Sequence, residues 1–298
     1  MVRQYKIHTN LDGADDKVWD VTNGKVRFYQ PSNLGLQSTN NIWQSNGIGV
    51  MGTRSITQPQ IEFKLETFGE SLEENYQLMK DFVNDILSQK FVTLEYQTEI
   101  FQVYADLALA DVTKTEGYGK NGTFSEKITF DIITKWYTYE NLTFDMIKNG
   151  EVIAGKSKVY GGTAPGNYKY VKGTSYTYYG ESNIDRLSRW DIKDEIFSFM
   201  GILYPQLPKT PAGIRFLDDI GNEYTAIVFK TEQVQNYILI NTDVNDEIYQ
   251  GWNGTTSLNL FPVMDFERYR TRIIKKGQME LINLSKAEFK IKRKADFV

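Results

Sequence analysis

The stretch Ile61-Glu62-Phe63-Lys64-Leu65-Glu66 alternates apolar and charged side chains at every position. Successive side chains of a β-strand point to opposite faces of its sheet, so this pattern is typical of a strand with one buried and one solvent-facing side. The same alternation recurs at residues 92–96 and 127–132, and residues 101–104 are expected to form the hairpin partner of 92–96. We therefore predict a mostly antiparallel sheet in this half of the chain.

A helix interrupts this pattern of strands. Ser71-Leu72-Glu73-Glu74 has the form of a capping box, in which a serine hydroxyl and a glutamate three residues later satisfy the free N–H groups at a helix start. Behind it, apolar side chains recur at spacings of three and four residues, which places them on one helical face. They are Leu72, Tyr76, Met79, Val83 and Ile86. We expect a helix over about residues 71–90 that covers one face of the sheet.

The second half of the chain also has the pattern of strands. Residues 224–229 and 237–240 are short apolar runs that suit buried strands of a sandwich, and Asn-Gly dipeptides such as Asn46-Gly47 favour tight turns. A length of 298 residues accommodates two domains, which we divide near Trp136. The prediction is a mainly β protein. Residues 1–135 form an N-terminal β-sandwich or split barrel with one α-helix, and residues 136–298 form a C-terminal β-sandwich.

The last expected strand covers residues 287–294. It sets Phe289 and Ile291 on one face and three lysines on the other. Lysines on a strand commonly prevent edge-to-edge pairing between molecules, so this pattern favours a place at the edge of a sheet.

The composition argues against several kinds of partner and site. A net charge of −4 gives no reason to expect a nucleic acid, whose phosphates require a basic surface. The chain has no cysteine, which excludes disulfides, thiolate catalysis and Cys-ligated metal. The N-terminus has no apolar signal region, and no apolar run reaches the roughly 18 residues of a membrane helix. We expect a soluble protein with no membrane partner.

The sequence also lacks the residue patterns that are typical of catalytic sites. His8 is the only histidine, and no Gly-x-Ser-x-Gly sequence supplies a nucleophile for it. Histidine-based metal sites usually need at least two such ligands, and no phosphate-binding glycine motif is present. We therefore predict no catalytic residue, no metal site and no cofactor, with His8 as a surface or capping residue and the chain as a non-enzymatic protein.

Two neighbouring stretches are candidates for contact with a partner. Residues 159–179 are rich in tyrosine, whose large apolar ring and polar tip suit contact surfaces. Residues 183–204 then place large apolar side chains among charges, ahead of three prolines. Two interpretations stay open: ordinary strands and loops, or an extension that binds a partner. On the second, the partner-binding residues are Tyr168, Tyr170, Tyr176, Tyr178, Tyr179, Leu187, Trp190, Phe197, Phe199 and Met200.

The chain resembles the distal tail proteins of siphophages, in the version found in lactococcal phages whose baseplates carry receptor-binding trimers. The stretches that carry the resemblance are Val18-Trp19-Asp20-Val21-Thr22-Asn23-Gly24-Lys25-Val26 and Lys290-Ile291-Lys292-Arg293-Lys294-Ala295-Asp296-Phe297-Val298, with the junction Trp136-Tyr137 between the two halves. It covers essentially the whole chain as an overall likeness, without a chemical motif. It implies that the C-terminal half is a galectin-like β-sandwich carrying an inserted arm-and-hand extension.

The resemblance also implies a structural role. In this family the N-terminal domain assembles into a six-fold ring, single or stacked, at the distal end of the tail tube. The ring joins the major tail protein of the tube above and a tail-associated tip protein below. The extension holds receptor-binding protein trimers for host adsorption. The expected location is thus the tail-tip baseplate of the virion, after synthesis in the host cytoplasm.

Two other functions stay open from the residues alone. A galectin-like sandwich could bind a cell-wall saccharide, and Trp252 with Asn253 is the obvious candidate platform. The histidine of the galectin pattern is absent from this half of the chain, which argues against that function. A β-sandwich glycoside hydrolase would need a pair of catalytic carboxylates, and no Asp or Glu stands out by its sequence context.

Overall fold

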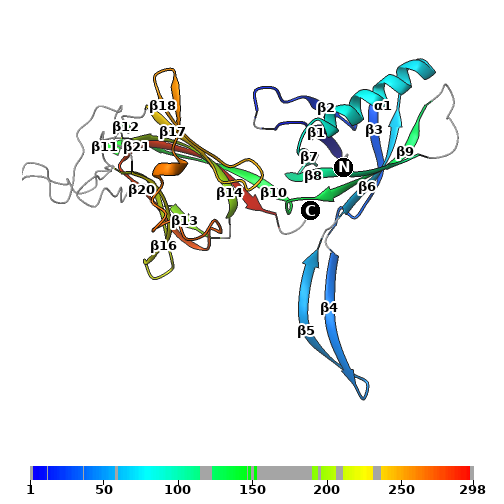
Figure 1. The fold of residues 1–298 in the computed structure, drawn as a ribbon. Helices are drawn as coiled ribbons and strands as arrows, with labels where there is room; N and C mark the ends of the chain where they lie inside the picture. The colour runs from blue at the N-terminus through cyan, green and yellow to red at the C-terminus, as the bar shows by residue number, and fades with distance from the viewer. Residues whose placement is uncertain are drawn as a thin grey trace, which may run out of the picture. The chain divides into compact units, whose positions relative to one another are not determined.

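The chain divides into two compact units. A computed structural model describes residues 3–11, 13–35, 37–57, 60–114, 123–145, 147–148, 151–152, 190–193, 196–205, 211–230 and 236–295. Unit 1 comprises Met1–Thr138 and Ala295–Val298, and unit 2 comprises Tyr139–Lys294 (Figure 1). Unit 2 is therefore inserted into the sequence of unit 1. Within the described ranges, no helix has both the length and the apolar character needed to cross a membrane.

Unit 1 is built on an antiparallel sheet with the strand order β2-β1-β7-β8-β9-β6-β3. The long strand β8 changes partner along its length: it pairs with β7 up to Leu107 and with β9 from Leu107 to Thr113. The two halves of the sheet thus share one strand. The strands are β1 (Gln4–His8), β2 (Val18–Asp20), β3 (Val26–Ser32), β6 (Gln60–Thr67), β7 (Val92–Gln97), β8 (Gln102–Thr113) and β9 (Ser125–Ile132).

The helix α1 (Leu72–Leu87) starts as the sequence predicts. Ser71 is the N-cap, and its Oγ accepts a hydrogen bond from the backbone N–H of Glu74 at 3.1 Å. The Glu74 carboxylate in turn accepts the backbone N–H of Glu70 at 2.7 Å, one residue before the position expected for a capping box. These bonds satisfy donors that have no partner inside the helix.

The buried face of α1 agrees with the predicted one only in its second half. Ile86 is buried and Met79 and Val83 pack against the core, as predicted, whereas Leu72 and Tyr76 are exposed. Phe82, which was not predicted, is fully buried and lies edge-on to the ring of Phe28 at 5.8 Å. The stripe that faces the sheet starts at Asn75, whose side-chain amide donates to the carbonyl of Ser71. Because this first buried position is polar, counting apolar residues assigns the start of the stripe to the wrong side chains.

Unit 2 is a sandwich of two antiparallel sheets, with strand orders β19-β18-β17-β14-β21-β10 and β13-β20-β15-β16. The two sheets share one core, in which the ring of Phe199 in the first sheet lies 6.0 Å from that of Phe216 in the second. The strands of the first sheet are β10 (Tyr137–Asp145), β14 (Ile196–Pro205), β17 (Tyr237–Asn241), β18 (Ile248–Asn253), β19 (Thr256–Asn259) and β21 (Leu284–Lys294). Those of the second are β13 (Trp190–Ile192), β15 (Ala212–Leu217), β16 (Glu223–Phe229) and β20 (Gly277–Ile282).

Three smaller elements complete the described chain of unit 2. Strands β11 (Ile147–Lys148) and β12 (Glu151–Val152) pair with each other, and η2 (Phe261–Val263) is a short 3-10 helix. The mainly β fold with one α-helix, predicted from the alternation of residues, is confirmed across the part of the chain that the structure describes. Of the two stretches proposed for the extension, residues 159–179 and 183–189 lie outside the described residues, whereas strands β13 and β14 occupy most of residues 190–204.

The prediction that β21 lies at a sheet edge is wrong. In the first sheet of unit 2, β21 lies between β14 and β10, so neither of its edges is free. Its outward lysines have partners within unit 2: Lys292 Nζ lies 2.7 Å from Asp243 Oδ2, and Lys290 Nζ lies 3.8 Å from the centroid of the Tyr139 ring. An ion pair and a cation–π contact thus account for side chains that the sequence pattern attributed to edge protection.

Candidate assembly surface

A separate hairpin in unit 1 is the most exposed apolar structure of the described chain. Strands β4 (Gln37–Ser45) and β5 (Ile48–Thr57) pair only with each other and extend beyond the other strands of unit 1 (Figure 1). Asn46 and Gly47 form the turn with φ of 50° and 79°. Two successive positive φ values are the condition for a type I′ turn, which Asn-Gly favours, so the turn predicted at this dipeptide is confirmed.

The side chains of this hairpin are exposed on both of its faces. Every residue from 38 to 55 is exposed. Trp43 pairs with Val50 on one face, and Ile42 pairs with Met51 on the other. The exposed fractions of these four side chains and of Ile48 lie between 49% and 69%.

The hairpin has polar side chains beside these apolar ones, but almost no charge to offset the exposure. Arg54 is its only charged residue, and the Arg54 Nε donates to Asn40 Oδ1 at 2.9 Å. An isolated two-stranded hairpin is marginally stable in water, and contiguous exposed apolar surface marks a site of protein contact. We therefore identify the β4–β5 hairpin as the candidate assembly surface.

Sequence reasoning missed this surface, although the signal was present. The glycines of Gly47-Ile48-Gly49-Val50-Met51-Gly52 lack the strand-and-helix context of a phosphate-binding loop. The informative feature is the pair of apolar runs on either side of Asn46-Gly47, with one charge in the whole hairpin. A two-stranded hairpin with a single charge and apolar residues at adjacent positions cannot bury both faces within itself.

The structure describes only four of the ten predicted partner-binding residues. Six of them lie outside the described residues: Tyr168, Tyr170, Tyr176, Tyr178, Tyr179 and Leu187. Trp190 is in β13 opposite Met279, and Phe197 and Met200 are in β14. Phe199 is 3% exposed in the core of unit 2, so the prediction that it contacts a partner is wrong for this residue. Its ring fills the space between the two sheets instead.

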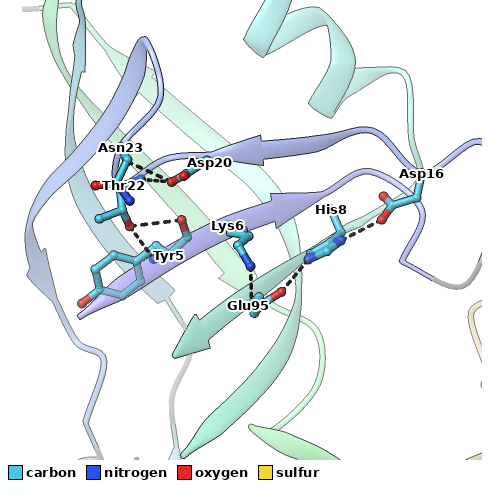
Figure 2. A network of polar contacts seen from close by, with 8 residues as sticks. All are labelled: Tyr5, Lys6, His8, Asp16, Asp20, Thr22, Asn23 and Glu95. Atoms are coloured by element: carbon cyan, nitrogen blue, oxygen red, sulfur yellow. Dashed lines mark hydrogen bonds and ion pairs between the residues drawn. The ribbon is translucent and has the colours of Figure 1, made fainter. Parts of the chain in front are cut away.

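His8 is not a surface residue, contrary to expectation, since it is only 8% exposed. Figure 2 shows its ring between two carboxylates: Nδ1 is 2.7 Å from Asp16 Oδ2, and Nε2 is 2.8 Å from Glu95 Oε2. Both ring nitrogens are therefore used within unit 1. In the described ranges, no group of three or more acidic or histidine side chains is arranged to hold a metal ion.

The candidate saccharide platform is partly covered. The ring of Trp252 stacks on that of Tyr237 with centroids 5.9 Å apart and planes 19° apart. A sugar stacks on a free aromatic face, and Tyr237 occupies one face of this indole. Asn253 lies at the turn into β19, where Thr256 Oγ1 donates to its backbone carbonyl at 3.0 Å.

Comparison with known families decides what kind of protein this is. Residues 4–133 match the family described as "Distal tail protein, N-terminal domain", and residues 135–298 match "Dit, C-terminal domain". The chain belongs to the distal tail protein family. The resemblance seen in the sequence is thereby confirmed over nearly the whole length.

Similar distal tail proteins come from phages of Lactococcus. The distal tail protein of Lactococcus phage p2 is 94% identical over 298 residues, and that of Lactococcus phage SK1 is 93% identical, each over the full length of both chains. Among solved structures, a chain of the phage P2 baseplate in its activated conformation with Ca is 94% identical over both full lengths, with a TM-score of 0.81. The Dit protein of phage SPP1 is 12% identical over 98% of this chain and all of its own, with a TM-score of 0.53, and shares the fold.

Proposed function

We propose that this distal tail protein is the hub of a baseplate at the tail tip of a siphophage virion, where it forms a hexameric ring at the distal end of the tail tube. The family assignment makes it a structural protein of the tail, and the chain similar to it over its full length is part of the phage P2 baseplate. The β4–β5 hairpin is the observation in this chain that supports self-assembly most directly.

The exposed hairpin fits the requirements of a ring. A closed ring is built from head-to-tail contacts, in which a surface of one copy binds a different surface of the next. A projecting apolar hairpin provides one half of such a contact, since a neighbouring copy can cover residues that cannot be buried within their own chain. In our proposal Trp43 and Val50 pack on the next protomer, in a single ring or in stacked rings.

The further partners follow from the place of the ring in the tail. In this proposal the ring contacts the major tail protein of the tube on one side and the tail-associated tip protein on the other. Unit 2 and its extension hold the receptor-binding protein trimers used for host adsorption. Neither nucleic acid nor membrane is a partner, in keeping with the net charge of −4.

We also propose that the chain acts without catalysis. The imidazole of its only histidine has both nitrogens bonded to carboxylates, which leaves no free ring nitrogen to act as a base. Saccharide binding through Trp252 is not proposed as a second function, because Tyr237 covers one face of that ring and the family assignment favours a structural role.

Light scattering on the purified full-length chain tests the proposal. We expect a mass six times that of the chain, or twelve times for stacked rings, and a larger complex when a receptor-binding protein trimer is added. The double variant Trp43→Ser, Val50→Ser is expected to shift the mass toward that of the monomer. Ile220→Ser is the matched control, because Ile220 is 82% exposed in the turn between β15 and β16 of unit 2.

Two results would contradict the proposal. A wild-type chain that stays monomeric at every concentration and ignores the trimer would exclude the hub function. A hexamer that persists in the double variant, with unchanged concentration dependence, would show that the ring does not depend on the hairpin.

A further inference from the structure

His8 connects two parts of unit 1 that are distant in the sequence. It is the last residue of β1, Asp16 lies in the following loop, and Glu95 lies on the neighbouring strand β7 (Figure 2). The distances from the ring to the two carboxylates are 2.7 Å and 2.8 Å, and Glu95 is 4% exposed. The histidine thus bridges residues 13–17 of that loop to the sheet.

The hydrogen bonds at the ring define its protonation. A neutral imidazole has one N–H and one lone pair, whereas an imidazolium has two N–H groups. Both atoms facing the ring are carboxylate oxygens, which accept hydrogen bonds. A neutral ring would therefore direct a lone pair at an oxygen less than 3 Å away, unless one of the carboxyl groups carried a proton.

The surroundings of the two carboxyl groups exclude that alternative. Glu95 Oε1 also receives Lys6 Nζ at 3.0 Å, and although burial raises the pKa of Glu95, the hydrogen bonds from His8 and Lys6 hold it below its usual value. Asp16 Oδ1 accepts the backbone N–H of Asn10 at 2.9 Å. A carboxylic acid is also a stronger acid than imidazolium by roughly two units or more, so a shared proton resides on the ring.

We propose that His8 is held as an imidazolium between Asp16 and Glu95, and that this clamp fixes residues 13–17 of the loop after β1 on the sheet in a proton-dependent way. The clamp is defined by these three residues. With Lys6 the cluster contains two cations and two anions, so it is neutral only when the ring carries both protons. His8 and Glu95 are buried, whereas Asp16 and Lys6 are partly exposed. Loss of the second proton leaves one carboxylate facing a lone pair, and the clamp therefore opens as the pH rises.

The other charged groups around the clamp leave this balance unchanged. In the loop, Asp15 accepts the side-chain amide of Asn10 at 2.7 Å, and Lys17 pairs with Asp85 of α1. On β2, the side chain of Asp20 accepts backbone N–H groups of its own turn, and Val18 lies opposite His8. On β8, the carboxylate of Asp106 lies beyond Thr93 and accepts its hydroxyl at 2.8 Å.

The absence of any other histidine makes the protonation directly measurable. Raman spectroscopy in D₂O detects the deuterated imidazolium in an assembly of any size, and the difference from His8→Gln isolates this residue. At a pH of about 7.5 only about one tenth of the histidine in an unfolded chain is protonated. We expect a larger imidazolium fraction for His8 in the folded full-length protein at that pH, because both ring nitrogens face carboxylate oxygens. A neutral ring would overturn the proposal.

Variants of the carboxylates test the clamp itself. Asp16→Asn and Glu95→Gln are each expected to lower the imidazolium fraction at least twofold at this pH. They should also raise the hydrogen exchange of residues 13–17 at fixed pH, as should His8→Gln. Asp15→Asn is the matched control, since Asp15 is in the same loop without contacting His8, and it should leave both readouts unchanged. A loop that exchanges equally in all four variants and the wild type would contradict the clamp even if the ring is charged.

Discussion

Trp43 and Val50 lie directly opposite each other across the β4–β5 hairpin, and both side chains are exposed to solvent. Cross-strand pairs of an aromatic and a β-branched residue stabilise sheets by packing on one face. Here the other face of the ribbon carries the equally exposed pair Ile42 and Met51. Such a ribbon adds apolar surface without adding to the core of its own unit, so its residues are available for contacts outside the chain.

The buried face of α1 can be tested by comparing two aromatic residues of the helix. Phe82→Ala is expected to lower the free energy of unfolding by about 3–5 kcal/mol, because it removes a fully buried ring from the core of unit 1. Tyr76→Ala should change it by less than about 0.5 kcal/mol, because that ring is mostly exposed. Chemical denaturation at one fixed protein concentration measures both. Equal effects would contradict the assignment of the face.

The helix cap gives a smaller and separate prediction. Ser71→Ala removes the acceptor of the Glu74 N–H and should cost about 1 kcal/mol of unfolding free energy. Ser71→Asp keeps an acceptor at this position and should restore the loss. Denaturation of both variants beside the wild type measures the difference, and a Ser71→Ala variant as stable as the wild type would argue against the cap.

The buried ion pair of β21 should show strong coupling. Lys292→Met is expected to cost about 3–5 kcal/mol, because Asp243 would keep its charge in a buried position without this partner. Adding Asp243→Asn to the same chain should recover part of the loss. Asp243→Asn alone is measured as well. If the losses of the two single variants simply add up in the double variant, the two residues act independently and the coupling is absent.

The stability of unit 1 should fall in acid through Glu95. The pKa of this carboxyl is held below its ordinary value of 4.5, since bonds from His8 and Lys6 outweigh the opposite effect of burial. A group with a depressed pKa in the folded state stabilises the protein above its unfolded pKa, and that contribution is lost as the pH falls through the folded value. Unfolding free energies between about pH 6 and pH 3 should therefore decrease less steeply in Glu95→Gln than in the wild type. Glu99→Gln, an exposed neighbour at the end of the same hairpin, should keep the wild-type slope.

The strands of unit 1 were predictable because their outward positions carry charges. Phe63 and Leu65 alternate with Glu62 and Lys64, and β6 buries the first pair as expected. The lysines of β21, in contrast, led to a wrong prediction. Lys292 follows the pattern of an edge strand, yet its partner Asp243 is 49 positions away and was invisible to local reasoning.

The buried His8 and the exposed Trp43 could not be predicted, because burial and exposure depend on residues that are distant in the sequence. His8 binds residues eight and 87 positions away, so its burial could not be read from the residues beside it. The exposure of Trp43 reflects the lack, in the part of the chain that the structure describes, of any strand or helix packed over it, and apolar residues in a strand normally predict the reverse. The resemblance to distal tail proteins supplied the function that these local patterns did not.

The insertion of unit 2 has a consequence for how such a tail part can be altered. The chain leaves unit 1 after Thr138 and re-enters it at Ala295, and the N–H of Ala295 donates to the carbonyl of Trp136 at 2.8 Å. The two ends of the insertion are therefore neighbours within unit 1. A short loop can close that gap, so one module can be exchanged for another there while the sequence that builds the first core stays intact. Recombination between phages can in this way replace the inserted unit as a whole, without any change to the residues that form the core of unit 1.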